Sequence, residues 1–297
     1  QLGAESASSL WTMSNSSRFW VSDFKVKEGL NEFTFLPLNG DYRGDLDGNG
    51  HLTAHWLGMT VHDAQSKTDL ALADLKGSAD MAEISGLWLS PRSDATLTAF
   101  TLTQPGNVKI TLEGLTTATE LAGDDLQTLS TRYQMKVATL NMESEEDRLA
   151  LTQGNLDLSL KGLDLEGYQT LQEASSKRVD EAAIQEALDK MLQRGATLEL
   201  ADLSARLNGE PVSLQGEAKL APTTLAQLMG SEEGMQALSG LLHAHLGEKL
   251  GQAVPQLAPM LEQFTAMGYL KAQESQLQAE LKLDKGAVTV NGLPLHP

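Results

Sequence analysis

Alternation of apolar and polar residues is the sequence feature that most constrains how this chain can fold. A period of two places successive side chains on opposite faces of a β-strand. Gly, Asn, Asp and Pro, which favour tight turns, separate the alternating segments. These segments are 52–61, 81–89, 96–102, 108–114, 135–142, 156–165, 197–207, 212–220, 277–283 and 287–290. Short links of this kind predict antiparallel hairpins with one apolar face that must be covered.

Helical spacing replaces this alternation in a few regions. Residues 180–194 carry an apolar stripe that stops at Gly195. Residues 231–250 place leucines at helical intervals, and residues 254–267 continue the pattern after Pro255, a residue that fits a first helical turn. A weaker helix is expected over 117–133.

Two Asn-Gly hairpin patterns, at 203–220 and 277–295, enclose part of this helical region. We therefore predict that 221–270 is a helical insertion between strands of one sheet. The predicted fold class is α+β: a large curved antiparallel β-sheet, with amphipathic helices packed on one face. A single elongated domain is expected over residues 1–297.

Charge and composition exclude several classes of protein. Forty Asp and Glu against 22 Lys and Arg give a formal net charge of -18, which would repel nucleic acid and anionic bilayers. A partner should therefore be neutral, basic or apolar. Because the chain has no Cys, disulfides, thiol nucleophiles and thiolate metal sites are excluded. No apolar run approaches the ~18 residues that a membrane helix needs.

Motifs for catalysis do not emerge. The sequence has no G-x-S-x-G elbow, no G-x-G-x-x-G, no Walker loop and no H-E-x-x-H. No carboxylate pair stands out as an acid/base couple. We assign no catalytic residue and no cofactor, and a non-enzymatic protein is the favoured interpretation.

The sharpest local signal is a segment that resembles the first half of a calcium loop. Asp45, Asp47 and Asn49 occur at alternate positions before Gly50, as calcium ligands do. The twelfth position, where a Glu should close the site, is Trp56. Asp-Gly and Asn-Gly also favour hairpin turns, so we interpret the segment as a turn.

Histidine spacing does not predict a metal site either. On a strand, His51 and His55 would share a face about 13 Å apart. On a helix, His243 and His245 would point about 200° apart. No metal ligand set is expected.

Apolar residues divide between the two ends of the chain. We expect an aromatic core in the N-terminal third, built from Trp20, Phe24, Phe33, Phe35, Trp56 and Trp88. In the C-terminal helices Leu and Met dominate, and Met suits adaptable apolar surfaces. A candidate ligand or partner surface there comprises Leu238, Leu242, Leu246, Leu257, Met260, Leu261 and Phe264. Simple core packing is the favoured interpretation of the same stripe, because apolar stripes at helical spacing are usually core.

The C-terminal half resembles a known family. The strings LDLSLKGLDLEGY, ATLELADLSARLNGEPVSLQGEAKL and LQAELKLDKGAVTVNGLPL are similar to the YdgA-like family of proteobacterial envelope proteins, a bacterial domain of unknown function, over residues 155–297. The resemblance implies an inner-membrane anchor followed by a periplasmic body. Because the chain starts at Gln1 rather than Met, we expect the anchor to precede it. The family offers no established catalytic residues to carry over.

Three functions are therefore considered. The first is a non-enzymatic periplasmic protein that presents an apolar surface or groove to a lipid-like ligand or an envelope protein. The second is a scaffold that self-associates as a homo-oligomer through strand edges or helices. The third is an envelope hydrolase whose site is not visible in the sequence.

Overall fold

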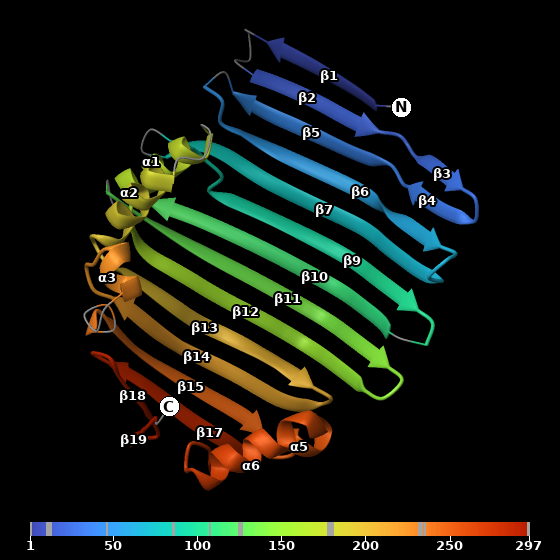
Figure 1. Cartoon of the computed structure of the whole chain (residues 1–297). Helices are drawn as coiled ribbons and strands as arrows, with labels where there is room; N and C mark the ends of the chain where they lie inside the picture. Colours follow the sequence, from blue (N-terminus) through green and yellow to red (C-terminus); the bar gives the residue numbers. More distant parts are fainter. Residues whose placement is uncertain are drawn as a thin grey trace. The chain divides into compact units, whose positions relative to one another are not determined.

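The computed structural model describes residues 2–9, 14–45, 47–84, 87–106, 108–123, 127–176, 181–230, 234 and 236–295. About 68% of the chain is strand and 15% is helix, and the strands form one large antiparallel sheet that is not closed (Figure 1). The predicted antiparallel sheet is thus confirmed.

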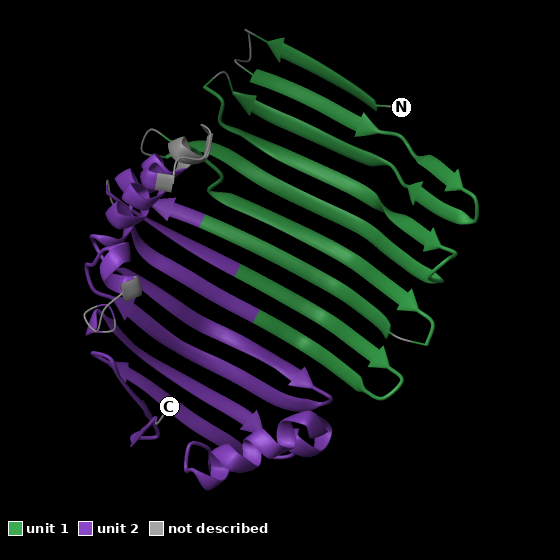
Figure 2. Cartoon of the chain, viewed as in Figure 1, with its two compact units in different colours: residues 1–120, 134–155 green, residues 121–133, 156–297 purple. Residues whose placement is uncertain are grey.

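Contacts divide the chain into two compact units (Figure 2). Unit 1 comprises residues 1–120 and 134–155, and unit 2 comprises residues 121–133 and 156–297. Three long strands, β10 (Val108–Gly123), β11 (Thr128–Ser144) and β12 (Arg148–Asp164), contribute residues to both units. We describe each unit by itself.

Unit 1 is built from strands joined by short turns. Beside its parts of β10 to β12, its elements are β1 (Leu2–Ser9), β2 (Ser14–Val21), β3 (Phe24–Glu28), β4 (Asn31–Phe35), β5 (Leu38–Asp45), β6 (Gly50–Asp63), β7 (Thr68–Ile84), β8 (Leu87–Leu89) and β9 (Arg92–Gln104). Pairing runs β1–β2–β5–β6–β7–β9–β10, all antiparallel. The β3–β4 hairpin joins this order because β4 pairs with β6 beyond the end of β5.

Unit 2 mixes strands with helices. Beside its parts of β10 to β12, its elements are α1 (Leu165–Ser176), α2 (Glu181–Leu192), β13 (Ala196–Leu207), β14 (Glu210–Leu220), α3 (Leu225–Gly230), β15 (Leu238–Gly247), α5 (Leu250–Ala253), the 3-10 turn η1 (Pro255–Leu257), α6 (Ala258–Ala266), β16 (Lys271–Gln273), β17 (Gln276–Asp284), β18 (Ala287–Val290) and β19 (Leu293–Pro294). Strands β13–β14–β15–β17–β18 pair in that order.

The strand predictions hold well. All ten alternating segments fall in strands, except that Leu165 starts α1 and that residues 85 and 86 lie outside the described residues. Both predicted hairpins form, and each contains two consecutive residues of positive φ. Asn208 and Gly209 have φ of 48° and 88°, and Asn291 and Gly292 have 51° and 79°. Turns of this kind match the twist of the strands they join.

Two of the predicted helices are present. Helix α2 lies within 180–194, although Asp180 is outside the described residues, and Gly195 follows the helix with φ of 78°. The 254–267 segment forms η1 and α6, with a Pro near the start of each. Helix α1 was not predicted.

The helix predicted over 231–250 is wrong, because residues 238–247 form strand β15. Leu238, Leu242 and Leu246 are four residues apart, an interval that lies on one face of either a helix or a strand. Gly240 and Gly247 weaken a helix, and hydrogen bonding to β14 and β17 on both sides completes a ladder. Residues 231–233 and 235 lie outside the described residues.

The weak helix predicted over 117–133 is also wrong. Residues 117–123 continue β10, and β11 begins at Thr128. The mixture of Thr, Ala and Leu in this stretch fits either period, and pairing of Thr116 to Glu120 with β9 selects the strand.

The packing of helices on one face of the sheet is not confirmed. Each described helix lies in a connection between strands of unit 2 (Figure 1). Helices α1, α2 and α3 gather at one end of the strands of this unit, and α5 and α6 lie at the other end. The insertion predicted over 221–270 is therefore two separate helical connections with a strand between them.

Candidate functional site

An uninterrupted apolar face covers much of the sheet in unit 1. Three neighbouring rows of directly paired residues cross six strands each, and all 18 side chains are apolar. The rows are Val26–Phe33–Val61–Leu70–Leu102–Ile110, Phe24–Phe35–Met59–Leu72–Phe100–Leu112 and Val21–Leu38–Trp56–Leu75–Leu97–Leu115. At about 4.8 Å between strands, each row is about 24 Å wide.

A register irregularity keeps these rows on one face. In β6, β7, β9 and β10, the interval between successive apolar residues of one strand is two residues along most of the strand. It is three residues between the second and third rows, for example from Leu72 to Leu75. At this level Asp74 and Gly114 have positive φ, as bulged residues do. Asp74 has no paired partner on β6 or β9, and Gly114 has none on β9. Without the bulge, one half of each strand would turn its apolar side chains to the other face.

Aromatic rings link the rows. Phe24 stacks on Phe35 with centroids 5.1 Å apart, and Phe35 stacks on Trp56 at 5.1 Å. Phe35 belongs to one side of the bulge and Trp56 to the other, so their contact shows that both sides share a face. Trp56 also donates its indole N–H to the carbonyl of Leu36 at 3.1 Å.

This apolar face is not a closed core. None of its 18 residues is buried; each is half-buried or exposed. Among the described residues of unit 1, Leu89 is the one buried hydrophobic side chain. The expected aromatic core is therefore corrected: Phe24 and Trp88 are 43% and 44% exposed. The alternation predicts which face is apolar, but it does not show whether anything covers that face.

The opposite face of the same strands is polar and carries cross-strand hydrogen bonds between His and Asp side chains. His51, His55 and His62 of β6 each bond an Asp of β7: Asp80 at 2.6 Å, Asp74 at 2.6 Å and Asp69 at 2.7 Å, in that order. Hydrogen bonds from Lys76, His55 and Thr98 hold the pKa of Asp74 well below its usual range. These contacts are typical of a solvated sheet face.

The calcium-like segment forms a hairpin turn between β5 and β6, as predicted. Asn49 donates both its backbone N–H and its side-chain amide to the carboxylate of Asp45, each at 2.9 Å. Asp47 lies within the turn, Gly48 has φ of 92°, and Leu46 is outside the described residues. Because Asp45 and Asn49 bond each other, two of the three candidate ligands already serve the turn.

In unit 2, three residues of the predicted surface lie on β15 and not on a helix. Leu238 pairs with Leu220, Leu242 with Leu281, and Leu246 with Leu277. They share one apolar face of the sheet, and all three are half-buried. Three of the seven residues of the predicted surface thus share one face, with the spacing of a strand and not of a helix.

The remaining four residues lie in η1 and α6 and face different ways. Leu261 is buried and lines a cavity of about 510 Å³ with Leu277 and Gly251. Met260 and Phe264 are exposed, and Leu257 is half-buried. The structure therefore brings Leu261 close to the sheet residue Leu277. Met260 is exposed, and the partly exposed ring of Phe264 lies 6.4 Å from the ring of the buried Tyr269.

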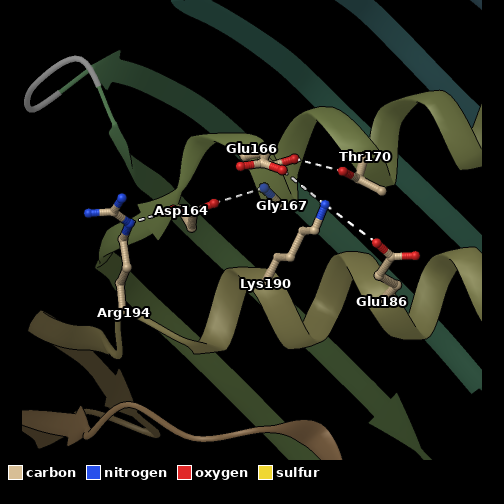
Figure 3. A network of polar contacts seen from close by, with 7 residues as sticks. All are labelled: Asp164, Glu166, Gly167, Thr170, Glu186, Lys190 and Arg194. Atoms are coloured by element: carbon tan, nitrogen blue, oxygen red, sulfur yellow. Dashed lines mark hydrogen bonds and ion pairs between the residues drawn. The ribbon is translucent and has the colours of Figure 1, made fainter.

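Polar contacts join the start of α1 to the end of α2 (Figure 3). The buried carboxylate of Asp164 accepts the backbone N–H of Gly167 at 2.9 Å and the Nε–H of Arg194. Lys190 bridges Glu166 at 3.0 Å and Glu186 at 3.4 Å, and the ion pair with Glu166 raises the pKa of Lys190. This network connects the start of α1 with the end of α2.

Three carboxyl groups of unit 1 have a lowered pKa. Hydrogen bonds, chiefly from Lys25, Ser66 and Lys76, lower the pKa of Glu32, Asp63 and Asp74 in that order. A general acid needs the opposite shift. Within the described ranges, no three His, Asp or Glu side chains gather as a metal site would need.

Membrane-spanning helices are not found: in the described part of the chain, no helix is both long and apolar enough to cross a bilayer.

Comparison with known proteins gives a family and no closer relative. A family described as "Bacterial protein of unknown function (DUF945)" matches residues 12–297, which confirms the expected bacterial domain of unknown function. No curated protein and no solved structure matches the chain.

Proposed function

Because the chain belongs to the DUF945 family of bacterial proteins of unknown function, its own surfaces must suggest what it does, and we propose that it is a non-enzymatic binding protein of the cell envelope. The three apolar rows of unit 1 are the binding surface. The ligand is lipid-like: neutral where it is bound and elongated enough to lie across several strands.

The observation that carries this proposal is the size and continuity of the uncovered face. Eighteen apolar side chains in three rows are all half-buried or exposed. Contiguous exposed apolar patches with an area above a few hundred Å² are rare on monomeric soluble proteins, and they mark binding sites. The net charge of -18 disfavours polyanions and anionic membrane surfaces as the occupant.

Ring stacking suits the face to acyl chains. Phe24, Phe35 and Trp56 present broad, rigid apolar surfaces that lose little conformational freedom on binding. Burial of each methylene group of a ligand contributes about 0.8 kcal/mol, so a chain of ten or more carbons lying on two rows would bind measurably.

A neutral fluorescent probe, N-phenyl-1-naphthylamine, tests the proposal. Leu102→Asp places a charge on the apolar face and should abolish the increase in probe fluorescence. The matched control is Thr101→Asp, one residue away on the polar face of β9, which should leave the increase intact. Far-ultraviolet circular dichroism establishes that both variants fold. Equal probe binding by all three proteins would refute the assignment of the ligand to this face.

Self-association through the same face is the second candidate. Its support is the same flat apolar surface, since two copies could bury it against each other. Native mass spectrometry of protein from its own envelope separates the two. A retained lipid in a monomer supports the ligand, and a dimer that Leu102→Asp dissociates supports the scaffold. We also propose that the protein is located in the periplasm and is attached to the inner membrane by an anchor.

A further inference from the structure

A cationic cavity lies at one end of the strands of unit 2, away from any surface proposed above. Its volume is about 590 Å³, within the range of small-molecule sites. Four cationic side chains line it, Lys161, Arg194, Lys219 and Lys285, against a single carboxylate, Asp284. In a chain with almost twice as many acidic as basic residues, this excess of positive charge is unusual.

Strand register builds one wall of the cavity. Thr197, Lys219, Ser239 and Asp284 are direct partners across β13, β14, β15 and β17. The row is about 14 Å long at the usual strand spacing. All four residues are polar, so the cavity opens on the polar face of this sheet and not on the apolar face that carries Leu242.

Ion pairs hold the cations in place from outside the cavity. Lys219 bonds Glu217 at 2.7 Å, Arg194 bonds Asp164, and Lys161 bonds Glu199. These three carboxylates are not among the lining residues. An ammonium group has three N–H donors and a guanidinium has five, so one ion pair leaves donors of Lys219 and Arg194 for a ligand.

Glycine lets two backbone segments that line the cavity approach each other closely. Gly195 follows α2 with φ of 78°, and a Cβ there would lie 2.4 Å from the carbonyl oxygen of Leu220. Leu220, Ala221 and Ala237 add a small apolar wall. The cavity thus combines a charged row with a minor apolar part.

We infer that this cavity binds a ligand that carries a phosphate group. Several cations around one space suit a multiply charged anion better than a single carboxylate, and the planar fork of Arg194 matches phosphate oxygens. The phosphate belongs either to a small soluble compound or to a lipid headgroup. This site is independent of the apolar face of unit 1, so either assignment can fail alone.

Isothermal titration calorimetry of the whole chain with inorganic pyrophosphate at low salt tests whether the cationic side chains of the cavity bind phosphate groups. Lys219→Gln combined with Lys285→Gln should weaken binding about tenfold or more, since each removes a charged hydrogen bond. Lys219→Gln alone is the fallback if the double variant is unstable. The matched control is Lys76→Gln: Lys76 is 55% exposed and bonds Asp74 two residues earlier on its strand, as Lys219 does with Glu217. It should bind pyrophosphate as the unchanged protein does.

Sedimentation with vesicles distinguishes the source of the phosphate. Binding to phosphatidylglycerol but not phosphatidylcholine vesicles, lost in the Lys219 variant, indicates a lipid headgroup. Pyrophosphate binding without vesicle binding indicates a soluble ligand. The inference is overturned if neither probe binds, if binding survives the cavity substitutions, or if Lys76→Gln weakens it equally.

Discussion

Units 1 and 2 share the same alternating strands but differ in how many hydrophobic side chains they bury. Of the buried hydrophobic residues in the described ranges, only Leu89 belongs to unit 1; the others, from Leu129 to Val290, belong to unit 2. The described helices likewise all belong to unit 2.

Connection length explains this difference. Within unit 1, successive strands are joined by at most four residues. Such turns leave no chain to fold back over the sheet. In unit 2, the connections 165–195, 221–237 and 248–270 are long enough for helices, which bury Ala187, Leu250 and Leu261. The comparison teaches that alternation creates an apolar face in both units, whereas hydrophobic side chains are buried mainly in the unit whose connections form helices.

The largest expected effect tests burial in unit 2. Leu261→Asp should lower the free energy of unfolding by about 3–5 kcal/mol, because a charge would enter the packed interface of α6. Met260→Asp, at the adjacent exposed position, should cost less than about 1 kcal/mol. Urea unfolding monitored by circular dichroism measures both. Similar losses for the two variants would mean that Leu261 is not more buried than Met260.

A smaller effect is expected at the helix pair. Asp164→Ala removes the acceptor for Gly167 N–H and for Arg194, and should cost about 2 kcal/mol. The exposed pair Arg18–Asp41 in unit 1 is the comparison, and Arg18→Gln should cost at most about 0.5 kcal/mol. Thermal unfolding measures both variants. If Arg18→Gln lowered the stability more than Asp164→Ala, the polar contacts of unit 2 would not be more stabilising than those of unit 1.

The turn at Asp45 should matter less. Asp45→Ala removes two hydrogen bonds to Asn49 and should cost about 1 kcal/mol. Since the segment is interpreted as a turn, neither EDTA nor calcium should shift the melting temperature of the unchanged protein. A large loss on chelation that calcium alone restores would establish a metal site instead.

The smallest expected effect is a pH dependence in unit 1. The pKa of Asp74 is lowered, so its contacts stabilise the fold above its unfolded pKa of about 3.9 and are progressively lost as the pH falls below it. The stability difference between the unchanged protein and Asp74→Asn should therefore shrink from pH 6 to pH 3. A constant difference would show that Asp74 acts through its shape and not its charge. The effect is small because the group is exposed.

Part of the candidate surface could be predicted, and part could not. Leu238, Leu242 and Leu246 were correctly grouped on one face, yet they were assigned to a helix because an interval of four fits both periods. The apolar rows of unit 1 were missed as a surface. Their signal was present in the sequence as the change of spacing from two to three, at Trp56 to Met59 and again at Leu97 to Phe100.

The sequence by itself determined that the ten alternating segments are strands, that Asn-Gly turns follow two of them, and which side chains of each segment share a face. These are local properties: alternation sets the face, and pairs such as Asn208-Gly209 set the turn. Only the tertiary structure decided that 238–247 is a strand, since its backbone bonds to β14 and β17, which lie far away in sequence. It also decided that Leu261 is buried and Met260 is exposed. Burial depends on which segments of the chain contact each other, and the local spacing of apolar residues does not predict those contacts.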